Sequence, residues 1–173
     1  MKEYDGKVRV VFKNMVVHPQ VVTDAHKAGC AAAQQGKFVA FKNAFWEKAF
    51  DPYAAAQDPA KLGMDNLLAI ARDLHLDTAR FKADMEGPAC KAQVEGDMAE
   101  LAKFHVDATP SFFINGKPLN GALPKEQFKQ LIDERIKVAQ ASGVAGADYY
   151  AKEVMAKGAK QFRSKQDSKP ANR

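Results

Sequence analysis

Several signatures of common protein classes are missing from this sequence. No apolar run approaches the roughly 20 residues that a membrane-spanning helix needs, and the N-terminus, MKEYDGKVRV, lacks the layout of a signal peptide. There is no phosphate-binding glycine loop, no dinucleotide-binding glycine motif, no serine nucleophile elbow and no paired zinc spacing. We therefore expect a soluble chain with no membrane span, no cofactor and no metal site.

Cysteine is scarce, with two among 173 residues. Cys30 and Cys90 lie far apart in the sequence, and no Cys-x-x-Cys motif occurs. The sequence therefore lacks the spacing that is typical of redox-active pairs and of many zinc sites.

Positive charge is in modest excess, and it is unevenly distributed along the sequence. The net charge is +5, and residues 151–173 carry seven Lys or Arg against Glu153 and Asp167, so the remainder is neutral. A nucleic-acid footprint is expected along a folded face. A terminal excess is more typical of a solvated tail, and we expect no nucleic-acid partner.

Hydrophobic periodicity predicts one strand followed by a series of helices. Residues 7–14 alternate, with Val8, Val10 and Phe12 on one face, which is typical of a strand. The segment 51–63 has two Asp-Pro steps and is predicted to be a loop with at most one short helical turn. Helical spacing and capping residues predict helices over 19–35, 37–50, 64–74, from Asp77, from Pro88, from Pro124 and over roughly 147–162.

The segment HVDATPSFFINGKPLNG, residues 105–121, predicts a hairpin. SFFI reads as a buried strand, Asn115-Gly116 as a two-residue turn, and KPLNG as the return strand. The order of strand, helices, hairpin and helix fits a mixed sheet with helices on both faces. A lone first strand before so many helices indicates that the sheet lacks a member.

The motifs GKVRVVFKN…HP, AAAQQGKF, LHLD…F, ATPSFFINGK and G…PKEQFKQLID occur in the order and spacing of DsbA-like thiol–disulfide oxidoreductases. The resemblance covers residues 5–138. It implies an α/β fold, with a thioredoxin-like mixed sheet and an inserted all-helical subdomain at about 18–104. It also implies a cis Thr109–Pro110 bond, and a role for Thr109 and Pro110 in holding an extended protein or peptide substrate. Relatives in this family are mostly exported to the periplasm or other oxidising spaces.

The chain departs from this family at its N-terminus. Family members begin with a central strand and a Cys-x-x-Cys helix, and GKVRVVFKN matches the strand that follows them. We therefore expect an N-terminally truncated domain over 1–142, then a C-terminal helix and basic tail over 143–173. No catalytic residue is predicted. The unpaired strand edges leave three alternatives: the missing elements lie upstream of Met1, the two remaining strand units close up on each other, or a second copy completes the sheet as a homodimer.

The two cysteines leave alternatives open. Some relatives carry a helix-to-helix disulfide in the insert, and Cys30 and Cys90 both fall on predicted helices there. The alternative is two separate buried thiols. His26 lies one turn before Cys30, yet no fourth ligand is in view, so a metal site is not predicted.

Two functional hypotheses remain. In the first, the chain is part of a DsbA-like thiol–disulfide oxidoreductase but lacks the redox Cys-x-x-Cys, so it is inactive in disulfide exchange by itself. In the second, it is a non-catalytic thioredoxin-fold module that binds peptides or partner proteins in the groove beside Pro110.

Overall fold

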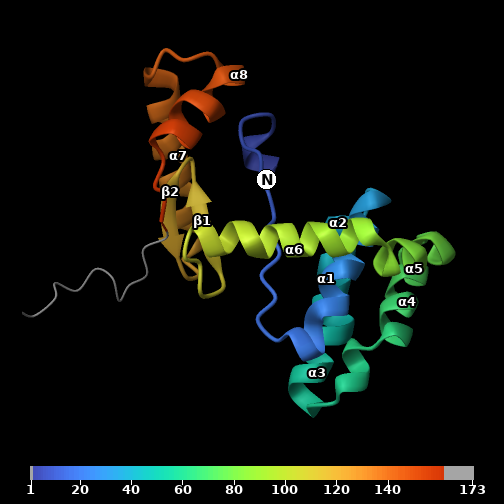
Figure 1. Ribbon diagram of the computed structural model, residues 1–173. Helices are drawn as coiled ribbons and strands as arrows, with labels where there is room; N and C mark the ends of the chain where they lie inside the picture. The colour runs from blue at the N-terminus through green and yellow to red at the C-terminus, as the bar shows by residue number, and fades with distance from the viewer. Residues whose placement is uncertain (1, 162–173) are drawn as a thin grey trace, which may run out of the picture. The chain divides into compact units, whose positions relative to one another are not determined.

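The computed structural model describes residues 2–161 of the chain, shown in Figure 1. Their contacts divide into two compact units. The helical unit is Lys13–Ala99, and the hairpin unit combines Met1–Phe12 with Glu100–Arg173. Most of the predicted basic tail, residues 162–173, lies outside the described residues. The domain boundaries predicted from the sequence stay a prediction.

Short helices make up the helical unit, in the order α1 (Pro19–Gln34), α2 (Phe38–Phe45), the π-helical η2 (Trp46–Phe50), α3 (Asp51–Ala56), the 3-10 segment η3 (Pro59–Leu62), α4 (Met64–Asp73), α5 (Thr78–Glu86) and α6 (Pro88–Lys103). α6 runs on past the unit's boundary at Ala99. Pro19 and Pro88 open their helices at positions where the missing N–H has no partner to lose. Asp77 caps α5 as predicted, because its carboxylate accepts the Arg80 backbone N–H at 3.0 Å.

The core of the helical unit is a single cluster of buried, mostly apolar side chains. Phe41 and Phe81 pack with tilted rings, their centroids 5.4 Å apart, and small residues of α1 let neighbouring helices approach closely. The cluster comprises Ala28, Cys30, Ala31, Ala32, Phe41, Ala49, Leu62, Leu67, Ile70, Ala71, Leu76, Phe81, Met85 and Cys90.

The predicted loop at 51–63 is wrong, because this segment contains α3 and η3. Pro52 has no N–H to offer the carbonyl of Lys48 four residues earlier, which is why Asp-Pro steps favour loops. Here the Asn66 side chain, from α4, donates to that carbonyl at 3.1 Å. The helix therefore continues through Pro52, because a residue distant in sequence satisfies the freed backbone group.

The hairpin unit contains η1 (Lys2–Tyr4), β1 (Ser111–Ile114), β2 (Lys117–Asn120), α7 (Lys125–Ala141), α8 (Gly146–Tyr149) and the π-helical η4 (Tyr150–Met155). β1 and β2 are antiparallel, and Phe112 of β1 packs edge-to-face on Phe128 of α7 with centroids 4.9 Å apart. Among the described residues of this unit from Glu3 onward, every side chain is exposed or only partly buried. The packed core therefore lies in the helical unit.

The predicted strand at 7–14 is also wrong. The sheet of the described residues has two strands, β1 and β2, and residues 8–17 form no regular element. Val10, Val11 and Phe12 are each at least half exposed. Alternation gives a segment one apolar face, but a strand also needs a neighbour to share its hydrogen bonds. The described sheet is thus an antiparallel pair rather than the mixed sheet expected.

Candidate functional site: the Pro110 edge and the Cys30–Cys90 disulfide

The hairpin turn positions the first of two separate candidate sites, one in each unit. Asn115 and Gly116 both have positive φ, 47° and 79°, as a two-residue hairpin turn requires. A side chain on Gly116 would lie 2.7 Å from Gly158 Cα. The Ala159 N–H also donates to the Gly116 carbonyl at 2.9 Å, so the turn rests directly on the backbone that follows η4.

Thr109 and Pro110 lie immediately before β1. Their peptide bond is cis, the isomer that the family resemblance implies. The Pro110 carbonyl accepts the Gly121 N–H at 2.9 Å, which extends the β1–β2 ladder by one bond. The Ser111 hydroxyl donates to the Ala108 carbonyl at 2.6 Å, so the chain on both sides of Pro110 is fixed locally.

The register decides which edge of the hairpin can accept another chain. Phe113 faces Pro118, and because proline has no N–H this pair is a non-hydrogen-bonded one. Positions alternate along an antiparallel ladder, so Ser111 also directs its backbone groups away from β2. On the far edge of β2 the missing N–H of Pro118 opposes strand pairing. The outward N–H of Ser111 therefore lies on the β1 edge, opposite the β2 edge from which Pro118 removes a donor.

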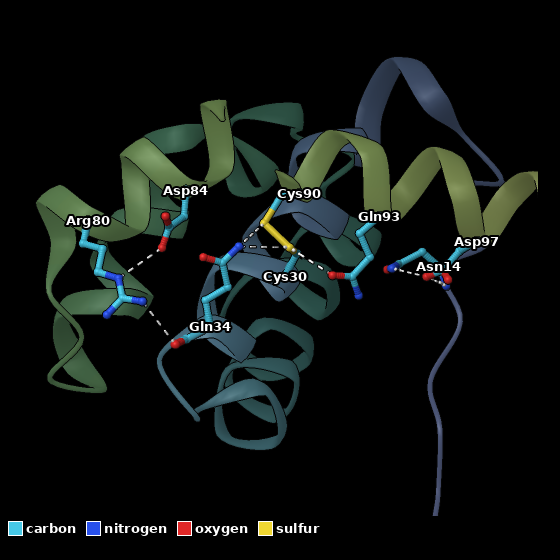
Figure 2. Close-up of a disulfide and its surroundings, with 8 residues drawn as sticks. All are labelled: Asn14, Cys30, Gln34, Arg80, Asp84, Cys90, Gln93 and Asp97. Atoms are coloured by element: carbon cyan, nitrogen blue, oxygen red, sulfur yellow. Dashed lines mark hydrogen bonds and ion pairs between the residues drawn. A yellow bond between two sulfur atoms is a disulfide. The ribbon is translucent and has the colours of Figure 1, made fainter. Parts of the chain in front are cut away.

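Cys30 of α1 and Cys90 of α6 form a disulfide, with Cα atoms 5.6 Å apart (Figure 2). This answers the alternative left open by the sequence, because the two cysteines are bonded rather than separate thiols. Both are buried, with Cys30 5% and Cys90 0% exposed. The sequence has no further cysteine, so no free thiol faces Pro110 from within these 173 residues.

Two glutamines surround the sulfur atoms. The Gln93 side-chain oxygen lies 3.4 Å from Cys30 Sγ, and the Gln34 amide lies 3.4 Å from Cys90 Sγ. Figure 2 shows Gln34 between the disulfide and the pair formed by Arg80 and Asp84. Sequence reasoning missed both glutamines, since a glutamine on a helix carries no signal of its own.

A second polar cluster on α6 was also missed. Asp97 is only 6% exposed, and its carboxylate accepts from Lys13 Nζ, the Asn14 N–H and Asn14 Nδ2 at 3.1, 3.0 and 2.7 Å. His26 Nδ1 lies 3.0 Å from Asn14 Oδ1. Burial lowers the pKa of His26, and the nearby Asp97 charge opposes that shift in part. The sequence did carry one indication of this cluster, because Asp97 lies on the same helical face as the apolar residues Val94 and Leu101.

Neither cluster resembles a metal site. Among residues 2–161 no three His, Cys, Asp or Glu side chains gather closely enough to hold an ion. In the same part of the chain, no helix is both long and apolar enough to cross a membrane.

Comparisons with known proteins agree with the fold. The family model described as Thioredoxin matches residues 1–134. A crystal structure of a thioredoxin-like oxidoreductase from Silicibacter pomeroyi is similar, with a TM-score of 0.59 and 28% identity over 78% of this chain and 72% of that one. The thioredoxin-like fold class predicted from the sequence is therefore confirmed.

Two curated relatives are named as transporters and are much longer than this chain. The Na⁺/H⁺ antiporter NhaA of Herminiimonas arsenicoxydans is 31% identical over 69% of this chain and 17% of its own length. NhaA 3 of Salinispora tropica is 36% identical over 66% of this chain and 16% of its own length. The chain thus spans about a sixth of the length of these relatives.

Proposed function

This chain belongs to the Thioredoxin family, and from that premise we propose that it serves DsbA-like thiol–disulfide exchange by holding an extended protein or peptide segment along β1. Thr109 and Pro110 are its substrate-binding residues. The exchanging cysteines come from outside residues 1–173, since these residues hold no Cys-x-x-Cys. The chain by itself does not carry out exchange.

The observation that carries this proposal is the difference between the two edges of the hairpin. Ser111 presents backbone groups on an edge that no other strand of the described residues occupies, whereas Pro118 removes an N–H from the opposite edge. An extended peptide that adds to a sheet edge binds mainly through such main-chain groups. The similar protein from Silicibacter pomeroyi is a thioredoxin-like oxidoreductase, which supports the same class of chemistry for this chain.

A matched pair of proline variants tests the binding step. Ser111 and Asn120 are cross-strand partners, so Ser111→Pro and Asn120→Pro each remove one outward N–H, from opposite edges. We expect Ser111→Pro to weaken binding of a fluorescent extended peptide at least tenfold, and Asn120→Pro to leave it within twofold. Ser111→Ala controls for the lost hydroxyl bond to Ala108. Equal losses of peptide affinity in the two proline variants would contradict the proposal.

The alternative is a non-catalytic binding module. It is favoured by the pairing of both cysteines in one buried disulfide, which leaves the chain no nucleophilic thiol. The two functions differ in the protein that the cell makes. An intact mass and N-terminal sequence that reveal an upstream Cys-x-x-Cys support the oxidoreductase, and a product that begins at Met1 supports the binding module.

A further inference from the structure

Few buried side chains attach α6 to the rest of the helical unit. From Pro88 to Ala99, the buried side chains are Cys90, Val94 and Asp97, which form one stripe along the helix. Of these, Cys90 belongs to the apolar core cluster, whose other members all lie between residues 28 and 85. The disulfide therefore supplies much of what holds the first turns of α6 against α1.

The two sulfur atoms are not equivalent. Cys90 is the third residue of α6, so the free N–H groups of the first helical turn favour negative charge on its sulfur. Cys30 lies deep within α1 and has no such stabilisation. Cys30 is also the cysteine with a trace of exposed surface, at 5% against 0% for Cys90. Attack at Cys30 is therefore favoured, because Cys90 is the better leaving group.

The surroundings also accommodate two thiols. In the disulfide neither sulfur carries a hydrogen, so the Gln93 oxygen, 3.4 Å from Cys30 Sγ, receives nothing from it. A Cys30 thiol would supply that donor. Gln34 has two amide orientations, and the one opposite to that in Figure 2 lets its nitrogen donate to both Asp84 oxygens at 3.1 and 3.3 Å. Its oxygen then faces the sulfurs and can accept from a Cys90 thiol.

We propose that the Cys30–Cys90 disulfide is a reversible redox site, which a dithiol reductant opens at Cys30, and that opening it frees the first turns of α6 from α1. The reductant's thiolate forms a bond to Cys30 Sγ while the Sγ–Sγ bond breaks, and the electron pair leaves on Cys90, which then takes a proton from water. The second thiol of the reductant, as its thiolate, then attacks the reductant sulfur that is bonded to Cys30 Sγ. It releases Cys30 as a thiol, and the reductant ends as a disulfide after giving up two electrons.

A trapping experiment tests the direction of attack. The native full chain is incubated briefly with glutathione, a monothiol with no second thiol for the intramolecular release step, and is then quenched with excess iodoacetamide. We expect glutathione on Cys30 and the alkyl group on Cys90, mapped by peptide mass spectrometry. The reverse pattern overturns the proposal, and so does trapping that is no faster than global unfolding of the same protein.

Hydrogen exchange tests the consequence. After reduction with dithiothreitol in native buffer, amides of residues 88–99 are expected to exchange at least tenfold faster than those of α4, because they open locally while α4 exchanges only through global unfolding. Equal exchange rates in the two helices after reduction would overturn the proposal, as would no change in α6.

A variant of Gln93 tests the stabilisation of the reduced state. Gln93→Leu removes the acceptor for the Cys30 thiol, so about fivefold more dithiothreitol is expected for half-reduction. Lys91→Leu, an exposed neighbour, is the matched control. Equal midpoints in the two variants would contradict the role of Gln93.

Discussion

At the scale of single residues, Asp97 shows how a buried charge is tolerated. Its carboxylate receives three hydrogen bonds, two of them from Asn14 and one from the cation Lys13. A buried charge without such partners would be strongly destabilising. These bonds fix the segment that leads into α1 against α6, within the helical unit.

We predict that Asp97→Asn lowers the free energy of unfolding by about 2 kcal/mol, because it removes the charge from three hydrogen bonds and turns an amide N–H toward a donor. Urea unfolding followed by circular dichroism measures this. Asp73→Asn is the control, since Asp73 pairs with Lys48 at the surface, where ion pairs add little to stability. Equal losses in both variants would refute the special role of Asp97.

His26 makes stability depend on pH. Burial, opposed in part by Asp97, lowers its pKa in the folded protein below the ordinary value of 6.5. The unfolded state then binds more protons than the folded state, so stability is full above about pH 6.5 and is lost as the pH falls toward the folded pKa. We predict that His26→Gln flattens this dependence in urea titrations between pH 7 and 5. An unaltered slope in His26→Gln would contradict the assignment.

At the scale of elements, the hairpin turn depends on the close approach of Gly116 to Gly158. Gly116 and Gly121 both have positive φ, so alanine at either position meets backbone strain of roughly 1–2 kcal/mol. The alanine methyl group at Gly116 would also strike the backbone of Gly158, whereas Gly121 has open space around it.

We therefore predict that Gly116→Ala costs roughly 1–3 kcal/mol more than Gly121→Ala. The comparison removes the strain that both variants share and isolates the packing against Gly158. Thermal unfolding of the two variants, followed by the near-ultraviolet signal of the aromatic residues, measures the difference. Indistinguishable midpoints would show that the turn does not rest on the segment after η4.

At the scale of the whole molecule, burial is divided unevenly. Within the described residues, the buried side chains all belong to the helical unit. Local stability follows the density of buried contacts. We predict that backbone amides of β1 and β2 exchange with solvent faster than those of α1 and α4, by at least a hundredfold, in native-state exchange followed by mass spectrometry. Equal protection would mean that the hairpin is stabilised by something other than the burial described.

The disulfide acts on the whole chain through its unfolded state. It closes a loop of sequence separation 60, for which the chain-entropy treatment gives about 4 kcal/mol. We predict that replacing both cysteines with alanine lowers the free energy of unfolding by about that amount in urea titrations. A loss below about 1 kcal/mol would show that the unfolded chain is not the state that the disulfide constrains.

The sequence by itself determined those features whose signal lies within a few residues. Asn115-Gly116 specifies the turn because its backbone conformation is a local property. Asp77, Pro88 and Pro124 mark helix starts for the same reason, and all three helices are present. The family motifs, of which the one around Thr109 and Pro110 is the most specific, together predicted the thioredoxin-like fold class.

Only the tertiary structure decided which groups meet. Residues 7–14 have the alternation of a strand but no neighbouring strand within the described residues, so they do not pair. Residues 51–56 form helix because Asn66 satisfies a carbonyl that Pro52 leaves free. The partners of Cys30 and Asp97 are likewise distant in sequence. Such pairings depend on how the chain closes on itself, and that closure is a property of the packed whole rather than of any short segment.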